Sequence, residues 1–270
     1  MHAIITVARF TLKDGLRHRV IYGVFIAALL TVACALLFSG MFMRDISKVI
    51  LDISLSAISM GALLVPFFLA INMLAGEIEH RTAYSMLSQP ISRSQFILGK
   101  YAGFLLITAA IVAIFTSATL VAMYGASFLF EPIHLKTFSV QAVLLSVIAN
   151  FMGVSMLLAA SVLWCTATTS SFLATLLTLS TYFIGQTIEE MVRFISSPPP
   201  GVNFSPLFKT VIQGILYVFP NLAAFDLKLQ AAHGIIAAGE SILYLGLYAG
   251  SYITVIISLA ILFFNKRDLA

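Results

Sequence analysis

Hydrophobic residues in this chain are grouped into long, nearly uncharged runs that are separated by shorter polar segments. A helix needs about 20 predominantly apolar residues to cross the hydrocarbon core of a bilayer. Six runs meet this length and predict six transmembrane helices: residues 20–43, 53–76, 96–124, 138–163, 172–195 and 242–264. The runs are too long for the strands of a membrane β-barrel. The expected fold is therefore an all-α integral membrane protein with one transmembrane domain over residues 1–270.

The segment before the first run, residues 1–19, has a different pattern. Within residues 3–16, apolar residues recur at helical spacing, and Arg9 and Lys13 lie on the flank of that apolar face. This pattern predicts an N-terminal amphipathic helix that lies in the membrane interface. A disordered tail is the alternative interpretation of the same segment.

The connection between the fifth and sixth runs, residues 186–241, is the most irregular part of the chain. It contains three consecutive prolines at positions 198–200, which exclude a helix there and favour an extended turn. Residues 207–219 are apolar but too short to span a bilayer, and they lie between Pro206 and Pro220. The sequence predicts a re-entrant helical segment there, in an outer loop.

Lysine and arginine residues near the span ends predict the orientation, because cytoplasmic loops carry an excess of them. Nine lie in the segments that would share a side with both termini, and three lie in the short loops of the other side. Both termini are therefore predicted to be cytoplasmic. The nine are Arg9, Lys13, Arg17, Arg19, Arg81, Arg93, Lys100, Lys266 and Arg267, and the three are Arg44, Lys48 and Lys136.

Composition supports the membrane assignment and narrows the chemistry. Hydrophobic residues make up 60% of the chain and charged residues 10%, whereas a soluble domain is about half apolar and about a quarter charged. The net charge of +4 follows from the cytoplasmic bias, and no basic helix or aromatic platform indicates nucleic-acid binding. The two cysteines, Cys34 and Cys165, show no metal-ligand spacing, so no metal site is predicted.

The chain contains no motif for energy conversion of its own. No Walker sequence is present, since Gly99-Lys100 is followed by Tyr101, and no catalytic set is predicted. The centres of the predicted spans contain essentially no ionisable residues, whereas an ion-coupled carrier would be expected to have them. Polar residues in the spans favour helix packing over a substrate role. Candidates for a translocation path are Ser59, Asn72 and Thr181.

The loop between the second and third runs, residues 77–95, has the most specific pattern. It begins with mixed charge (EIEHRT), contains a proline at position 90, and continues as ISRSQFILGK into the third run. Ser92 is placed to cap the helix that follows. A compact cytoplasmic element of this kind can transmit a push from a soluble partner to the spans, although an ordinary turn between spans fits the residues equally well.

The run EIEHRTAYSMLSQPISRSQFILGK resembles the signature loop of the type-2 ABC exporter permeases. A Pro220-Asn221 segment before the last run and a basic C-terminal end also resemble that family. In this family the loop is the coupling helix, which docks on a separate ATP-binding subunit. The resemblance assigns docking and coupling to Glu77, Glu79, Arg81, Thr82, Leu87, Pro90, Ser92 and Arg93.

The resemblance also implies the partners and the location. It implies a membrane permease, an exporter in this family, driven by an ATP-binding subunit that holds ATP and Mg²⁺, while this chain binds no cofactor. It implies a half-transporter that pairs with a second copy or a homologue, and we expect small-residue faces of spans one and five to form that contact. The expected location is the inner cell membrane as a multi-pass protein. The alternative function is a stand-alone secondary carrier or channel.

Overall fold

The computed structural model describes residues 2–17, 20–39, 46–79, 91–129, 139–196 and 218–266, together with positions 205, 210 and 214. Every regular element in these ranges is a helix, in agreement with the predicted all-α fold. The elements are α1 (His2–Arg17), α2 (Val20–Ser39), α3 (Ile46–Leu64), η1 (Val65–Ala75), α4 (Gly76–Glu79), α6 (Arg93–Leu129), α7 (Val140–Ala167), α8 (Ser171–Ser196), η3 (Ala223–Phe225), α10 (Lys228–Ala232) and α11 (Gly239–Lys266).

Five helical stretches in the described ranges are long and apolar enough to cross a membrane. They coincide with the second to sixth predicted spans and cover Ser47–Glu79, Arg93–Ala126, Val140–Ala167, Ser171–Ser196 and Gly239–Lys266. The first predicted span coincides with α2, whose apolar stretch Gly23–Phe38 is shorter. The count of six spans therefore remains a prediction, as do the cytoplasmic position of both termini and the interfacial position of α1.

The predicted re-entrant segment, residues 207–219, lies almost wholly outside the described residues. The re-entrant assignment therefore stays a prediction. The part of the outer connection that the structure does describe, from residue 218 onward, contains η3 and α10 and leads into α11.

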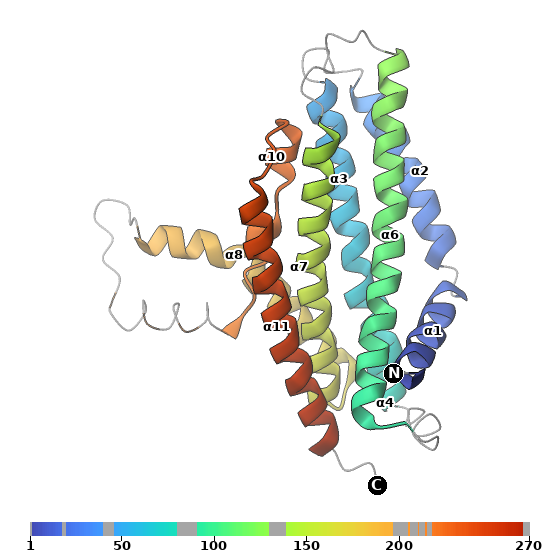
Figure 1. The fold of residues 1–270 in the computed structure, drawn as a ribbon, viewed down its shortest axis with the longest axis vertical. Helices are drawn as coiled ribbons and strands as arrows, with labels where there is room; N and C mark the ends of the chain where they lie inside the picture. The colour runs from blue at the N-terminus through green and yellow to red at the C-terminus, as the bar shows by residue number, and fades with distance from the viewer. Residues whose placement is uncertain are drawn as a thin grey trace.

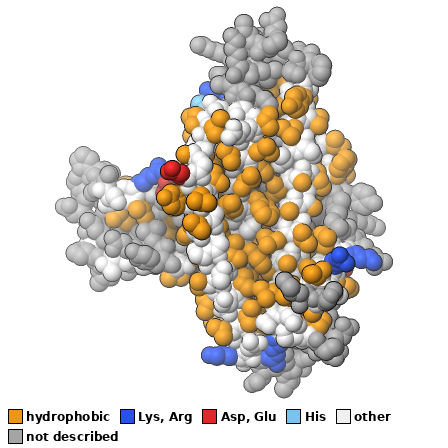
Figure 2. Space-filling model, in the orientation of Figure 1, with side chains coloured by type: hydrophobic (Ala, Val, Ile, Leu, Met, Phe, Trp, Pro, Cys, Tyr) orange, Lys and Arg blue, Asp and Glu red, His pale blue; other side chains and the backbone are white. Residues whose placement is uncertain are grey.

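Helix α7 forms the centre of the bundle, and α3, α6 and α11 stand beside it (Figure 1). In the most apolar window of α7, 67% of the residues are buried within the chain, compared with 28% in α8 and α11. Figure 2 shows that hydrophobic side chains cover the middle of the visible face, while Lys and Arg side chains lie toward its margins. Such a surface is stable in contact with lipid tails. The tails are as apolar as the side chains, so there is no hydrophobic driving force to bury it.

The second predicted span changes its helical type halfway along. Helix α3 continues directly into the π-helix η1, and Pro66 lies in the first turn of η1. Proline has no N–H to donate to the preceding turn, so the regular α-helical ladder is interrupted at this point. π-Helical turns are rare and frequently mark functional positions. The π-helix η1 packs on the central helix α7 and continues into α4, which ends at residue 79. It therefore connects the centre of the bundle to the start of the loop at residue 80.

Helix α1 lies directly against the first half of α6, and two glycines allow this close approach. A Cβ atom on Gly99 would lie 2.6 Å from Cβ of Val7, and one on Gly103 would lie 2.6 Å from Cβ of Thr11. Gly99 and Gly103 are four residues apart and therefore lie on one face of α6. This small-residue face lets the two backbones approach, as in helix pairs of membrane proteins. The N-terminal helix is thus packed on the helix that follows residues 80–90.

The segment after the outer connection crosses the bundle as a strap, which we define as residues 220–225. The backbone N–H of Leu222 donates to the carbonyl of Gly185 in α8 at 2.9 Å. The backbone N–H of Asn221 donates to the Tyr248 hydroxyl of α11 at 3.0 Å. The strap therefore joins α8 to α11 before the chain turns into α10. In Figure 1, the second half of α8 leaves the bundle sideways beyond this contact.

Candidate functional site

Two helices hold the ends of the loop that contains residues 80–90. Helix α4 ends at Glu79, and α6 begins at Arg93. Ser92 starts α6 with a reciprocal cap, because its Oγ accepts from the Gln95 N–H at 3.3 Å and its own N–H donates to Gln95 Oε1 at 3.1 Å. This capping box satisfies backbone donors that a helix start leaves open. The predicted capping position of Ser92 is confirmed.

A buried ion pair joins the two helices. Lys100 Nζ in α6 lies 2.5 Å from Glu77 Oε1 in α4, and the Lys100 side chain is fully buried. The same ammonium group lies 5.6 Å from the centre of the Phe96 ring. A buried charge is tolerated only when it is paired, and removing one partner of such a pair costs about 3–5 kcal/mol. Glu77 and Lys100 therefore fix the last turn before residue 80 against the first turns after residue 90.

Glu79 connects the same turn to α8. Its Oε2 atom accepts a hydrogen bond from the backbone N–H of Ser171, the first residue of α8, at 3.1 Å. The N-terminus of a helix has unsatisfied N–H groups and a partial positive charge, so a carboxylate is stabilising there. The end of the second predicted span is thereby bonded to the start of the fifth.

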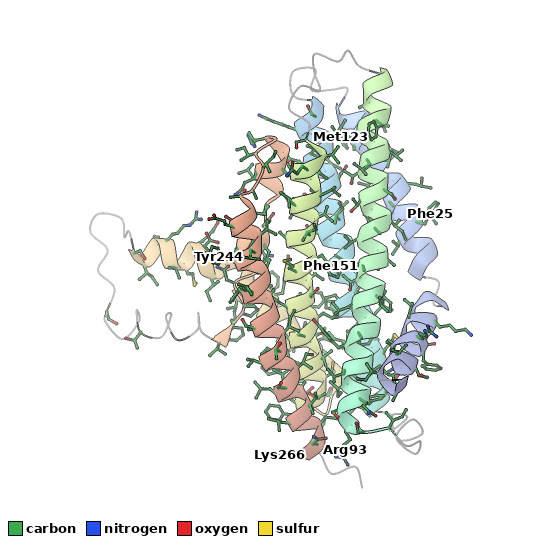
Figure 3. All side chains as sticks on the ribbon, viewed as in Figure 1. Phe25, Arg93, Met123, Phe151, Tyr244 and Lys266 are labelled. Atoms are coloured by element: carbon green, nitrogen blue, oxygen red, sulfur yellow. The ribbon has the colours of Figure 1, made fainter. Side chains whose placement is uncertain are left out.

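Arg93 connects the other end of the loop to α11. Its Nη1 atom donates to the backbone carbonyls of Phe264 at 3.2 Å and Asn265 at 2.9 Å, in the last turn of α11. A cation at a helix C-terminus satisfies open carbonyls and interacts favourably with the helix dipole. The rings of Phe96 and Phe264 stack beside this contact at 5.8 Å. Figure 3 shows Arg93 and Lys266 together at this end of the molecule.

These contacts define one site, which we call the loop-anchor cluster: Glu77, Glu79, Arg93 and Lys100. The cluster bonds the two ends of the loop to each other and to α8 and α11. Lys100 was not predicted as a site residue, although a lysine inside the start of an apolar run was a visible signal. Four predicted docking residues lie at positions 80–90, outside the described residues: Arg81, Thr82, Leu87 and Pro90.

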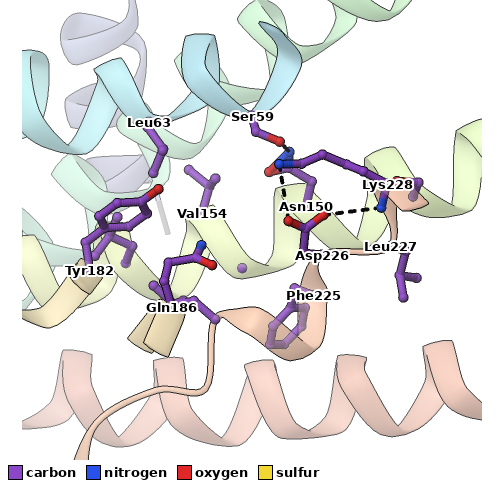
Figure 4. A pocket seen from close by; sticks show the side chains of 14 residues that line it. Ser59, Leu63, Asn150, Val154, Tyr182, Gln186, Phe225, Asp226, Leu227 and Lys228 are labelled. Carbon is purple, nitrogen blue, oxygen red and sulfur yellow. Dashed lines mark hydrogen bonds and ion pairs between the residues drawn. The ribbon is translucent and has the colours of Figure 1, made fainter. Parts of the chain in front are cut away.

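A partly open cavity of about 60 Å³, which we call the polar cavity because charged, amide and hydroxyl side chains lie among its apolar lining, borders α3, α7 and α8, and Figure 4 shows its walls. Its lining comes from α3, α7, α8, the strap and the residues that follow the strap. Asn150 Nδ2 donates to Ser59 Oγ at 2.5 Å. In the same lining, Asp226 Oδ2 lies 3.3 Å from Lys228 Nζ. The sequence did not predict this acid–base pair in a cavity, because both residues precede α11 in what reads as a loop.

The three predicted path residues do not line one common cavity. Ser59 lines the polar cavity, whereas Thr181 lines a separate, mainly apolar cavity of about 460 Å³ between α7, α8 and α11. Thr181 Oγ1 accepts there from Trp164 Nε1 at 3.0 Å. Asn72 lies in η1, and its Nδ2 donates to the Phe68 carbonyl at 2.7 Å. A translocation role for these residues stays a prediction.

Comparison with protein families decides what this molecule is. Residues 5–269 match the model of the ABC-2 family transporter proteins. The chain belongs to the ABC-2 transporter family. A comparison with curated proteins gave no match. The match covers nearly every residue, so the sequence resemblance seen in the loop extends over the whole ABC-2 chain.

Membership defines the general role of this ABC-2 protein. ABC-2 permeases are membrane transport subunits that are not themselves catalytic, and they normally pair with a separate ATP-binding subunit. The five long apolar helices agree with a multi-pass membrane protein. The ABC-2 protein is thus a transmembrane permease of an ABC transporter. Among its described residues, no group of three or more His, Cys, Asp or Glu side chains could hold a metal ion.

Proposed function

We propose that this permease is an exporter subunit whose loop, residues 77–95, docks on an ATP-binding subunit that holds ATP and Mg²⁺. The observation that supports this most directly is the loop-anchor cluster. A loop whose two ends are bonded to α6, α8 and α11 cannot move without moving those helices. Force applied to residues 80–90 therefore reaches three long helices through Glu77, Glu79 and Arg93.

The remaining parts of the proposal follow from the sequence. The permease has six spans with both termini in the cytoplasm of the cell, and it lies in the inner membrane. Two copies form the complete transporter through spans one and five, which correspond to α2 and α8. Small residues are exposed on both helices, among them Gly23, Ala27 and Ser180, so small-residue faces are present there for contact with a second copy.

Site-directed cross-linking tests where the ATP-binding subunit docks. Cys34 and Cys165 are first replaced by alanine, and a single cysteine is then introduced by Ser88→Cys in the loop. We expect the Ser88→Cys protein to cross-link to a co-expressed ATP-binding subunit through a short bifunctional reagent. Ser241→Cys, at the exposed start of α11, is the matched control and should give no cross-link.

Transport measurements separate the two function classes. In vesicles, a permease driven by an ATP-binding subunit requires ATP hydrolysis, whereas a stand-alone carrier or channel moves its substrate without that subunit. Co-purification of an ATP-binding subunit with no cross-link from Ser88→Cys would contradict docking at the loop. Transport by the permease alone would contradict the ATP-driven proposal and favour the carrier or channel.

A further inference from the structure

The polar cavity contains one negative and one positive side chain in the same wall. Asp226 Oδ2 lies 3.3 Å from Lys228 Nζ, and Asp226 Oδ1 accepts from the Lys228 backbone N–H at 3.2 Å. The two side chains keep 42% and 29% of their exposure, so neither charge is sealed by protein atoms. A partly accessible ion pair is weakly held and can exchange one partner for another.

Neutral polar groups complete the lining on the other side. Ser146 is only 2% exposed, yet it lines this cavity. Tyr182 and Gln186 of α8 also line the cavity, and their side-chain polar atoms make no hydrogen bond to any residue in the described ranges. The side-chain amide of Asn150 donates one hydrogen bond to Ser59 Oγ, and this bond fixes the orientation of the amide group. Small-molecule sites are typically apolar with a few hydroxyl or amide groups that are available to hydrogen-bond the ligand.

Apolar side chains form the rest of the wall, including Leu63, Val154, Leu157 and Phe225. Apolar walls lower the local dielectric constant, so charge–charge interactions at Asp226 and Lys228 are stronger than in bulk water although both side chains are partly exposed. A ligand with a single charge would be attracted by one of these two residues and repelled by the other, so its net gain would be small. A ligand with both charges can pair with Asp226 and Lys228 at the same time.

We propose that the polar cavity binds a small zwitterionic group, with its ammonium on Asp226 and its phosphate or carboxylate on Lys228. The side chains of Ser146, Tyr182 and Gln186 hydrogen-bond the remaining polar atoms of the ligand. This proposal goes beyond the docking function and does not depend on it, because binding to the permease alone does not require an ATP-binding subunit.

The zwitterion could be a free solute or the headgroup of a lipid. Phe225 of the strap stacks on Tyr248 at 6.1 Å, and Tyr248 also lines the apolar cavity of about 460 Å³. An apolar chamber therefore lies just beyond the wall of the polar one. Because the same charges recognise both sources, the experiment includes a soluble and a lipid form of one headgroup.

Trp164 is the only tryptophan of the chain and lines the apolar cavity, so its fluorescence can report binding in the full-length permease in a non-ionic detergent. The probes are O-phosphoethanolamine, dihexanoyl-phosphatidylethanolamine and, as an anionic control, dihexanoyl-phosphatidylglycerol. Thermal unfolding with each probe gives a second readout that does not depend on Trp164. We expect a saturable effect of a zwitterionic probe and none of the anionic lipid. Binding of O-phosphoethanolamine would show that a free zwitterionic solute is enough to fill the site. Binding of dihexanoyl-phosphatidylethanolamine but not of O-phosphoethanolamine would show that the site takes the headgroup of a lipid.

Charge variants test the assignment of the two residues. Asp226→Asn and Lys228→Gln should each lower the affinity roughly tenfold or more, the size expected from the loss of one charge-assisted contact. Asp52→Asn and Lys266→Gln are the matched controls, because both side chains are outside the cavity, and they should bind like the native chain.

Two double variants keep the test decisive if a single change impairs folding. The charge-reversed protein, Asp226→Lys with Lys228→Asp, retains a pair and should still bind the zwitterion. The neutral protein, Asp226→Asn with Lys228→Gln, should not bind it. Native binding by the neutral protein, equal binding of the anionic lipid, or no binding of any probe by the native chain would each overturn the proposal.

Discussion

Arg93 and Asn265 are 172 residues apart in the sequence, yet the Arg93 guanidinium donates to the Asn265 carbonyl at 2.9 Å. The contact joins the start of α6 to the end of α11. Arg93 also belongs to the loop that resembles a coupling element. Its side chain is thus an internal connection from that loop to the last span.

Replacement of Arg93 removes the hydrogen bonds that connect the loop to the end of α11, so movements of the loop should no longer be transmitted to α11. Loss of hydrogen bonds to a charged donor costs about 1.5–3 kcal/mol when the site is well formed. We expect Arg93→Ala to lower substrate-stimulated ATPase activity of the assembled transporter while leaving assembly intact. Arg9→Ala, on the exposed face of α1, is the control and should behave like the native protein. Loss of assembly in Arg93→Ala would instead assign Arg93 to docking.

The buried pair of Glu77 and Lys100 should show strong thermodynamic coupling. Glu77→Gln leaves the fully buried Lys100 ammonium without its charge partner, and we expect a loss of about 3–5 kcal/mol of stability. The double variant Glu77→Gln with Lys100→Met removes both charges and should recover most of this loss. Thermal unfolding of the four proteins in detergent measures the coupling. Additive effects of the two single changes would contradict the pairing.

The contact between α1 and α6 should be sensitive to one methyl group. In Gly99→Ala the new Cβ would lie 2.6 Å from Val7 Cβ, so the helices must separate, and we expect overpacking to cost about 1–3 kcal/mol. Gly125→Ala lies on the same helix with no atom within 4 Å and should be neutral or slightly stabilising. Unfolding temperatures of the two variants check this. Equal stability would show that α1 does not pack on α6 through this face.

The strap should depend on the missing side chain at Gly185. A Cβ atom there would lie 2.7 Å from the Pro220 backbone carbonyl, which cannot rotate away as a flexible side chain can. Gly185→Ala should therefore displace the strap and weaken ligand binding in the polar cavity. Gly250→Ala in α11 meets no atom within 4 Å and is the control. Limited proteolysis of residues 218–227 should be faster in Gly185→Ala, and unchanged cleavage in both variants would contradict the close contact.

Several elements could be predicted from local sequence because their causes are local. Long apolar runs predicted five of the long helices, and the capping residue Ser92 predicted the start of α6. The change to a π-helix at Val65 was missed, since Pro66 marks an interruption without specifying the type of turn that follows. The early start of the second span at Ile46 was also missed, because polar residues such as Lys48 and Asp52 interrupt its apolar pattern.

The candidate site was only partly predictable. The resemblance of the loop to a family signature indicated Glu77, Glu79 and Arg93. The sequence could not indicate that Glu79 meets Ser171, or that Arg93 meets the end of α11, because those partners are distant in the chain. The acid–base pair of Asp226 and Lys228 was missed for a similar reason. Both residues read as loop residues until the strap folds them back against α7 and α8.

The sequence by itself determined the membrane class, the long helices and the family resemblance, because apolar length, capping and short motifs act over a few neighbouring residues. Tertiary structure decided which charges are paired, which glycines admit a neighbouring backbone, and which polar groups share a cavity. These relationships depend on helix packing, and packing brings together residues whose separation along the chain carries no information about their distance in space.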